Sequence, residues 1–347
     1  MFDLIKELTE LPGPVGQEDS VLERFKTLWQ ATGAKIEQTQ IGNVLGRMNG
    51  DGPKLLLVAH ADELCYLVRA IDESGFLWLA RGQSWSREAS RRTNFMGQRV
   101  KVLSPTEDIP GVIATATGHA GQLFLEEPHS LTWDDFWVDT GLSREALLEK
   151  SVTPGTRIIW DTPTTQMGPH IVGKALDDRV PLAILTELIR RLNPTDLVWN
   201  LTVACTVQEE IGLIGAAALG GLETFDAAIA LEIGLAGDIP GITARDLPIK
   251  LGEGPLLIHK DAGVHYDYRL TQQLAETAQQ ANIPIQHAIF GSFRSDGVEL
   301  MKADIPSALM AFPGRYTHSP FETGHLADIE AMVDWLYAFV TSAEGIS

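Results

Sequence analysis

The stretch LVWNLTVACTVQEEIGLIG, residues 197–215, is an apolar run that ends in the adjacent pair Glu209-Glu210. Residues 197–207 are rich in Leu, Val, Ala and Thr and predict a buried β-strand. The alanine-rich, glycine-punctuated residues that follow predict a helix. Two neighbouring carboxylates repel each other and raise one of their pKa values unless a cation compensates for their charge. The stretch therefore predicts a strand–helix unit with a metal ion beside its glutamate pair.

The same alternation of strands and helices continues on both sides of this stretch. Short apolar runs over residues 54–60 and 227–233 predict strands buried on both faces. Apolar residues at helical spacing predict amphipathic helices over residues 180–192 and 329–340. Strands that alternate with helices imply an α/β fold, here a mixed sheet sandwiched by helices.

Residues 68–161 have a different pattern, in which short β-like runs are broken by Gly and Pro. Within this segment only residues 143–150 predict a helix. We therefore expect a small β-rich domain inserted at residues 68–161. It would separate the two parts of an α/β catalytic domain, residues 1–67 and 162–347.

Composition limits the classes of partner. The 347 residues are 44% hydrophobic and 21% charged, as in a globular protein of about two domains. The formal net charge of −19 disfavours binding to nucleic acid or to anionic membranes, because both need basic surfaces. No apolar segment approaches the ~20 residues needed to span a bilayer.

The cysteines and the first residues indicate the compartment. Cys65 and Cys205 are the only cysteines, and each lies in an apolar run, which disfavours a disulfide framework and a thiolate zinc site. Residues 1–8 carry charges throughout and are typical of an amphipathic helix rather than a secretory signal. We expect a cytoplasmic protein.

Metal-competent side chains end apolar runs at five distant places: His60, Asp177, the Glu209-Glu210 pair, Glu232 and His318. The carboxyl ends of neighbouring strands in an open α/β sheet meet at one crevice, so these segments can converge there. Two imidazoles and three carboxylates suit a pair of divalent ions with one bridging carboxylate. Such ions lie ~3.5–4 Å apart and can hold a bridging hydroxide that is nucleophilic near neutral pH.

Proton transfer needs a further carboxylate that lies beside the ions without binding them. One member of the Glu209-Glu210 pair can do this while the other binds metal. Asp62 lies two residues beyond His60, on the same face of an extended strand, where it can hydrogen-bond the second ring nitrogen. Each signal alone has a plainer explanation, such as a helix cap at Asp177 or a solvated turn at the glutamates. Their joint occurrence favours a metal centre.

These segments match a known family in residue and order. They are residues 60–63 (HADE), 173–179 (GKALDDR), 208–212 (QEEIG) and 315–320 (RYTHSP). In the inserted segment, residues 97–100 (GQRV), Pro128-His129 and residues 136–141 (FWVDTG) match as well. The chain resembles an M42 metallo-aminopeptidase, of the glutamyl, deblocking and tetrahedral aminopeptidase group, over nearly its whole length.

The resemblance implies a role for each predicted site residue. Five would bind two metal ions: His60 and Glu232 the first, Glu210 and His318 the second, and Asp177 both. Glu209 would be the general base and then the acid, and Asp62 would support His60. Zinc is the expected metal, although cobalt and manganese accept the same ligands. The Asp177–Asp178 peptide bond is expected to be cis, as in relatives.

The implied function is an aminopeptidase that removes N-terminal residues from peptides by attack of the bridging hydroxide. Because relatives assemble into hollow dodecamers through a PDZ-like inserted domain, we expect a homo-oligomer in which this domain serves assembly or substrate access. Two alternatives stay open. One is a two-metal deacylase or carboxypeptidase on the same fold, and the other is a non-catalytic scaffold subunit.

The sequence departs from the family pattern at three places. Glu232 stands where many relatives carry Asp, and its longer side chain can shift the metal or its identity. Residues 293–297 (FRSDG) replace a frequent Gly-Gly-Thr-Asp stretch, which changes the wall on the substrate side. Cys65 stands where Gly is common, and this is a packing change.

Overall fold

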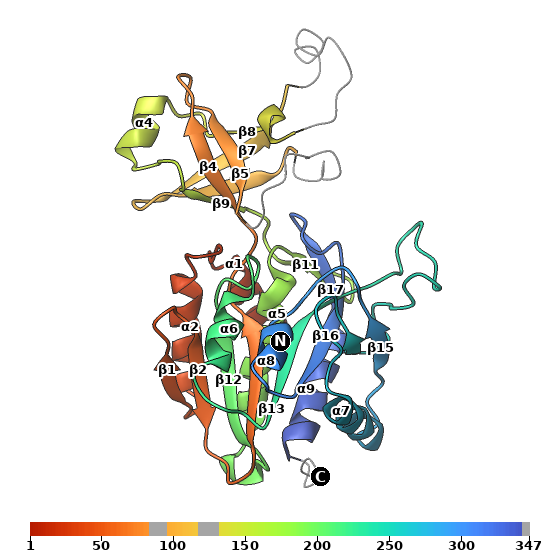
Figure 1. Cartoon of the computed structure of the whole chain (residues 1–347). Helices are drawn as coiled ribbons and strands as arrows, with labels where there is room; N and C mark the ends of the chain where they lie inside the picture. Colours follow the sequence, from red (N-terminus) through yellow and green to blue (C-terminus); the bar gives the residue numbers. More distant parts are fainter. Residues whose placement is uncertain (83–95, 117–131, 342–347) are drawn as a thin grey trace. The chain divides into compact units, whose positions relative to one another are not determined.

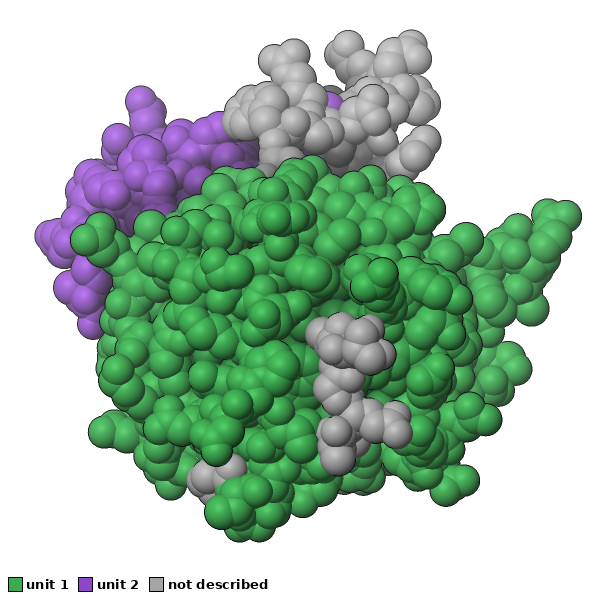
Figure 2. All heavy atoms as spheres, turned by 60° about the horizontal axis from the view of Figure 1, so that its bottom comes forward, with its two compact units in different colours: residues 1–63, 164–317, 321–347 green, residues 64–163, 318–320 purple. Residues whose placement is uncertain are grey.

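The computed structural model describes residues 1–82, 96–116 and 132–341, so Pro128-His129 lies outside the described residues. The chain divides into two compact units, coloured green and purple in Figure 2. The first unit consists of residues 1–63, 164–317 and 321–347, and the second of residues 64–163 and 318–320.

The first unit is built around a mixed β-sheet with eleven strands in the described part of the chain. They are β1 (Lys35–Gln38), β2 (Val44–Met48), β3 (Lys54–His60), β10 (Thr165–Met167), β11 (His170–Gly173), β12 (Asn200–Thr206), β13 (Ala227–Leu235), β14 (Leu256–Lys260), β15 (Gln286–Ile289), β16 (Ser307–Arg315) and β17 (Glu322–His325). Nine strands follow the order β1-β2-β12-β3-β13-β16-β17-β11-β10, and β14 pairs with both β15 and β16 (Figure 1). The central pairs β12–β3, β3–β13 and β13–β16 are parallel, whereas the pairs toward both ends of that order are antiparallel.

Helices cover both faces of this sheet, because its central strands are apolar on both sides. In β3, Leu55 and Leu57 belong to one hydrophobic core, and Leu56 and Val58 belong to another on the opposite face. The first core takes in α1 (Phe2–Glu10), α2 (Asp19–Gln30), α5 (Leu176–Arg191), α7 (Tyr268–Gln280) and α9 (Leu326–Thr341). The second takes in α6 (Ile214–Gly220) and α8 (Gly297–Lys302). A short 3-10 helix spans Pro194–Asp196.

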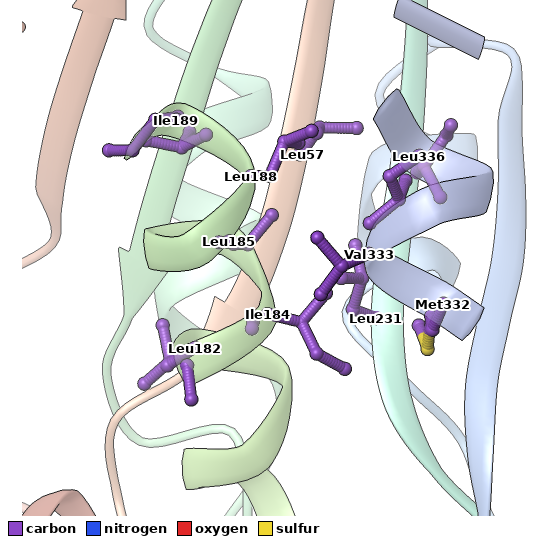
Figure 3. Packing of buried hydrophobic residues seen from close by; sticks show 14 of the residues in the cluster. Leu57, Leu182, Ile184, Leu185, Leu188, Ile189, Leu231, Met332, Val333 and Leu336 are labelled. Carbon is purple, nitrogen blue, oxygen red and sulfur yellow. The ribbon is translucent and has the colours of Figure 1, made fainter. Parts of the chain in front are cut away.

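The centre of the first core lies between α5, α9 and the parallel strands. Figure 3 shows Leu188 of α5 and Leu336 of α9 beside Leu57 of β3 and Leu231 of β13. All four side chains are 0–1% exposed. The α5 helix is therefore anchored along its length by apolar packing.

The second unit is a closed barrel of six strands in the residues that the structure describes. The strands are β4 (Tyr66–Ile71), β5 (Leu77–Arg81), β6 (Arg99–Leu103), β7 (Asp108–Ala114), β8 (Trp137–Asp139) and β9 (Arg157–Trp160), in the order β4-β5-β8-β7-β6-β9. All the pairs are antiparallel. The barrel has its own core, in which Leu77, Leu79 and Val138 are fully buried. Helix α4 (Arg144–Glu149) and a 3-10 helix (Trp133–Asp135) complete the unit.

The predicted fold class, a mixed sheet sandwiched by helices with a small β-rich insertion, is confirmed. The strand predicted over residues 54–60 is β3, and the one predicted over 227–233 continues to Leu235. The helix predicted over 180–192 is α5, whose backbone is non-helical at Asp177 and Asp178, so its regular turns begin after these two residues. Of the helices in the described residues, none has the length and apolar character needed to cross a membrane.

Candidate metal centre

The carboxyl ends of three neighbouring strands bring the predicted residues to one edge of the sheet. His60 is the last residue of β3 and pairs with Thr206, the last residue of β12, so Glu209 and Glu210 follow at the same edge. On the other side of β3, Ala230 of β13 pairs with Val58. Glu232 is therefore level with His60, because each lies two residues further along its strand.

The start of α5 adds two aspartates to this edge. Asp177 Oδ1 lies 3.0 Å from Nε2 of His60, and Asp178 Oδ2 accepts a hydrogen bond of 3.1 Å from the backbone N–H of His60. The peptide bond between the two aspartates is cis, as the resemblance implied. His60, Asp177, Asp178 and Glu232 are all buried, and each offers a ligand atom within 4.8 Å of the others.

A second group of possible ligands shares one residue with the first. Asp177, Glu210 and His318 also offer ligand atoms that lie within 4.8 Å of one another. His318 stands in the turn after β16, where its φ of 60° is in the left-handed region. Asp177 is common to both groups, which is the geometry of a carboxylate that can serve two ions.

Asp62 organises the glutamate pair through backbone hydrogen bonds. Its Oδ1 accepts from the N–H of Glu209 at 3.0 Å, and its Oδ2 accepts from the N–H of Glu210 at 3.1 Å. Nδ1 of His60 lies 3.1 Å from the backbone oxygen of Asp62 and 3.5 Å from its Oδ1. Asp62 thus contacts both His60 and the glutamate pair. Its carboxylate mainly accepts hydrogen bonds from the backbone N–H groups of Glu209 and Glu210.

The electrostatics of the centre call for a cation. Burial raises the pKa of Asp178, Glu209 and Glu232 well above ordinary values, and neighbouring carboxylates raise each of them further. Burial acts to lower the pKa of His60, but hydrogen bonds with Asp177 and Asp62 outweigh it and leave that pKa well above its usual value. A divalent ion would relieve this mutual repulsion, because it favours the ionised carboxylates and the neutral imidazole.

The residues present also fit a metal ion by their chemistry. Oδ1 of Asp178 is buried and has no hydrogen-bond partner among the residues that the structure describes. Buried carboxylate oxygens are rarely left in this way, so the atom has spare capacity to accept a ligand bond or a proton. Imidazole nitrogens with carboxylate oxygens are the donor set that zinc, cobalt and manganese accept.

Three residues of the centre were not predicted as site residues. Asp178 stands beside Asp177 in the chain, and that adjacency was the available signal. Glu322 in β17 accepts the backbone N–H of Asp177 at 2.9 Å, and no local pattern marks it. Asp296, next to α8, accepts a 2.5 Å hydrogen bond from the hydroxyl of Thr206. The last two contacts depend on which strands are neighbours, which the sequence does not show.

A family model, curated relatives and solved structures all match this chain and indicate the same family. The model of the M42 glutamyl aminopeptidase family matches residues 42–335. A protein of Acetivibrio thermocellus with a provisional aminopeptidase name is 32% identical over 339 residues, which are 97% of each chain.

Two solved structures have the same fold over the whole chain. The TET aminopeptidase of a marine-sediment archaeon of the Thaumarchaeota superimposes with a TM-score of 0.91 at 28% identity, covering 99% of this chain and 96% of that one. The TET1 peptidase of Pyrococcus horikoshii, described as assembling into a tetrahedron or a large octahedral shell, has a TM-score of 0.85 at 25% identity, with 98% and 99% covered. The chain therefore belongs to the M42 glutamyl aminopeptidase family of peptide hydrolases.

Proposed function

We propose that the protein is a two-metal aminopeptidase that releases N-terminal residues from peptides. The observation that carries this proposal is the membership of Asp177 in both groups of possible ligands. In the proposed assignment His60 and Glu232 hold one ion, Glu210 and His318 hold the other, and Asp177 contacts both. When bound, the ions would polarise the carbonyl of the scissile bond and lower the pKa of a water molecule between them.

Glu209 is the residue proposed to move the proton. It is 9% exposed, and its Oε2 lies 4.0 Å from Nε2 of His60, beside the proposed ligands. A carboxylate in this position can accept a proton from the attacking water and deliver it to the leaving amine. Asp62 supports the step because it accepts a hydrogen bond from the backbone N–H of Glu209 and so helps to position the Glu209 side chain.

The charge of the centre favours a substrate with a free amino terminus. The carboxylates of the centre carry eight negative charges when ionised, whereas two divalent ions supply four positive charges; they belong to Asp62, Asp177, Asp178, Glu209, Glu210, Glu232, Asp296 and Glu322. A cationic α-ammonium group is attracted to such a site, whereas the terminal carboxylate of a carboxypeptidase substrate is repelled. This argument supports the aminopeptidase over the carboxypeptidase alternative.

Metal analysis combined with a substrate panel tests the proposal. We expect two divalent ions per chain and hydrolysis of aminoacyl-anilides and free peptides. A chelator should abolish the hydrolysis, and Zn²⁺, Co²⁺ or Mn²⁺ should restore it. N-acetylated peptides should be inert.

Each alternative predicts a different result in the same panel. Release of C-terminal residues from N-blocked peptides would identify a carboxypeptidase, and removal of the acyl group would identify a deacylase. Bound metal without hydrolysis of any substrate in the panel would indicate a scaffold subunit.

We further propose that the protein works as a homo-oligomer and that the barrel unit takes part in assembly or substrate access. The support is the description of the P. horikoshii relative as a tetrahedron or an octahedral shell, together with the close likeness of fold.

A further inference from the structure

Three charged side chains that none of the proposed catalytic steps uses are buried next to the metal centre. Glu63, Lys174 and Arg179 are 2%, 3% and 0% exposed. Nζ of Lys174 lies 2.6 Å from Oε2 of Glu63, and Nη2 of Arg179 lies 3.7 Å from Oε1 of the same carboxylate. Burying charges costs desolvation energy that their attraction often fails to recover, so such a cluster is weak evidence for a role in stability.

Arg179 connects this cluster to the N-terminal segment. Its Nε donates to the backbone oxygen of Ala61 at 2.7 Å. Its Nη1 donates to the oxygens of Leu8 and Leu11 at 2.7 and 3.1 Å, and its Nη2 donates to that of Gly13 at 3.4 Å. One guanidinium therefore joins the end of α1, the break that follows it, and the chain just after β3.

Glu63 makes the matching connection from the other side. Its Oε1 accepts from the N–H of Gly13 at 3.1 Å, and its own N–H donates to the oxygen of Gly13 at 2.9 Å. A methyl group at Gly13 would overlap the guanidinium of Arg179 and lie 2.6 Å from Cγ2 of Val21. The glycine is thus the point at which the N-terminal segment can approach the buried charges.

The cluster joins the two segments that carry proposed metal ligands. Glu63 lies three residues after His60, and Lys174 and Arg179 lie three residues before and two residues after Asp177. The ion pair between Lys174 and Glu63 therefore spans from the end of β3 to the start of α5. The two segments that this pair joins are the ones that carry His60 and Asp177, whose ligand atoms are 3.0 Å apart.

We propose that Glu63, Lys174 and Arg179 are positioning residues that hold His60 and Asp177 at metal-binding distance, with residues 8–13 as their anchor. The inference rests on the proposed function, because it assumes that these two residues bind a metal ion. It assigns the N-terminal segment a part in metal affinity although that segment supplies no ligand.

Zn²⁺ affinity in two variants tests the inference. Lys174→Met removes one charge of the cluster, and Gly13→Ala disturbs it without changing any charge. The controls are Lys250→Met, in an exposed ion pair with Glu253, and Gly221→Ala, where the nearest atom to the added methyl group is 3.6 Å away. Competition with a chromophoric chelator should show Zn²⁺ binding about 10–100-fold weaker in both test variants. Both controls should stay within about twofold of the wild type.

Urea unfolding of the metal-free variants separates positioning from a purely structural role. If both variants unfold at lower urea concentration yet bind Zn²⁺ as tightly as the wild type, the cluster is structural and the inference is wrong. Should Lys174→Met fail to fold, Glu63→Gln takes its place, because it keeps the size of the side chain and the acceptor for Gly13. A wild-type protein that binds no Zn²⁺ would overturn the proposed function itself. Equal Zn²⁺ binding by the wild type and the variants would instead overturn only this inference.

Discussion

At the scale of single residues, the adjacent glutamates Glu209 and Glu210 differ in which residues their side chains lie near. Glu209 and Glu210 follow each other in the chain, and their amides bind the two oxygens of one carboxylate, Asp62. Their side chains nevertheless differ, because Glu210 belongs to a group of possible ligands with Asp177 whereas Glu209 does not. This difference supports the proposed roles, with Glu210 as a metal ligand and Glu209 as the residue that moves the proton.

The role of Glu209 predicts a selective loss in Glu209→Gln. Turnover of an aminoacyl-anilide should fall by about 10²–10⁴-fold, because the amide cannot carry the proton. Metal content, measured by mass spectrometry after dialysis, should remain that of the wild type. Glu210→Gln is the matched control and should lose metal as well as activity. Normal turnover in Glu209→Gln would remove it from the mechanism.

Asp296 predicts a pH dependence of stability. Burial raises its pKa to about 6 in the folded protein, from an ordinary value of 3.8, although the hydrogen bond from Thr206 lowers it. Because the folded state holds this proton more tightly, the associated stability is present below pH 3.8 and is lost as pH rises through about 6.

The variant Asp296→Asn tests this dependence in metal-free protein. Asn cannot ionise, so the variant does not lose stability as Asp296 does when it ionises. The free energy of unfolding of Asp296→Asn relative to the wild type should therefore increase between pH 5 and pH 7.5, as measured by urea unfolding at each pH. The exposed Asp51→Asn serves as the control. A difference between Asp296→Asn and the wild type that does not change with pH would contradict the expectation.

At the scale of elements, α5 has two tasks. Its non-helical start carries Asp177 and Asp178, and the regular turns that follow pack against β3, β13 and α9 through residues such as Leu185 and Leu188. The packing holds the helix in place, and the cluster of Glu63, Lys174 and Arg179 is the proposed control on where Asp177 lies. The apolar core and the candidate metal centre therefore use different parts of one helix.

Truncation of Leu188 should separate these parts. The side chain is 0% exposed, so Leu188→Ala should lower the free energy of unfolding by about 2–5 kcal/mol through lost burial and the cavity left behind. Urea unfolding measures this loss, and kcat well below the melting temperature should be unchanged. Leu222→Ala, at a side chain that is 59% exposed, should change stability by less than about 0.5 kcal/mol. A clear fall of kcat in Leu188→Ala, measured at a temperature where the variant is folded, would show that packing also controls the site.

At the scale of the whole molecule, the two units have separate cores. The barrel closes on its own apolar side chains, and the sheet of the first unit is covered by its own helices. The family pattern nevertheless runs through both units, since the family model matches residues 42–335.

Assembly is the prediction at this scale. Size-exclusion chromatography with light scattering should give a mass that is a multiple of 37.9 kDa, the mass of one chain. The reason is the likeness to a relative described as a tetrahedral or octahedral assembly. A mass of 37.9 kDa at micromolar concentration would contradict the proposed homo-oligomer.

Much of the fold was predictable because it depends on local order. The strand β3 and the helix α5 follow from polarity and spacing within a few residues, which are readable without knowledge of distant neighbours. The edge strand β15 and the strand β16 were not predicted, although β16 is buried almost throughout. A continuous apolar run does not reveal which neighbours it pairs with, and β16 pairs with strands from three other parts of the chain.

By itself the sequence determined the element types, the family and a set of metal-competent residues at strand ends, because periodicity and residue chemistry are properties of short segments. Only the tertiary structure decided which of these residues meet, and it added Asp178, Glu322 and the buried cluster of Glu63, Lys174 and Arg179. The ion pair of Lys174 and Glu63 joins residues 111 positions apart. Contacts of that kind exist only when strand order and helix packing bring distant segments together, and no pattern along the chain encodes their distance.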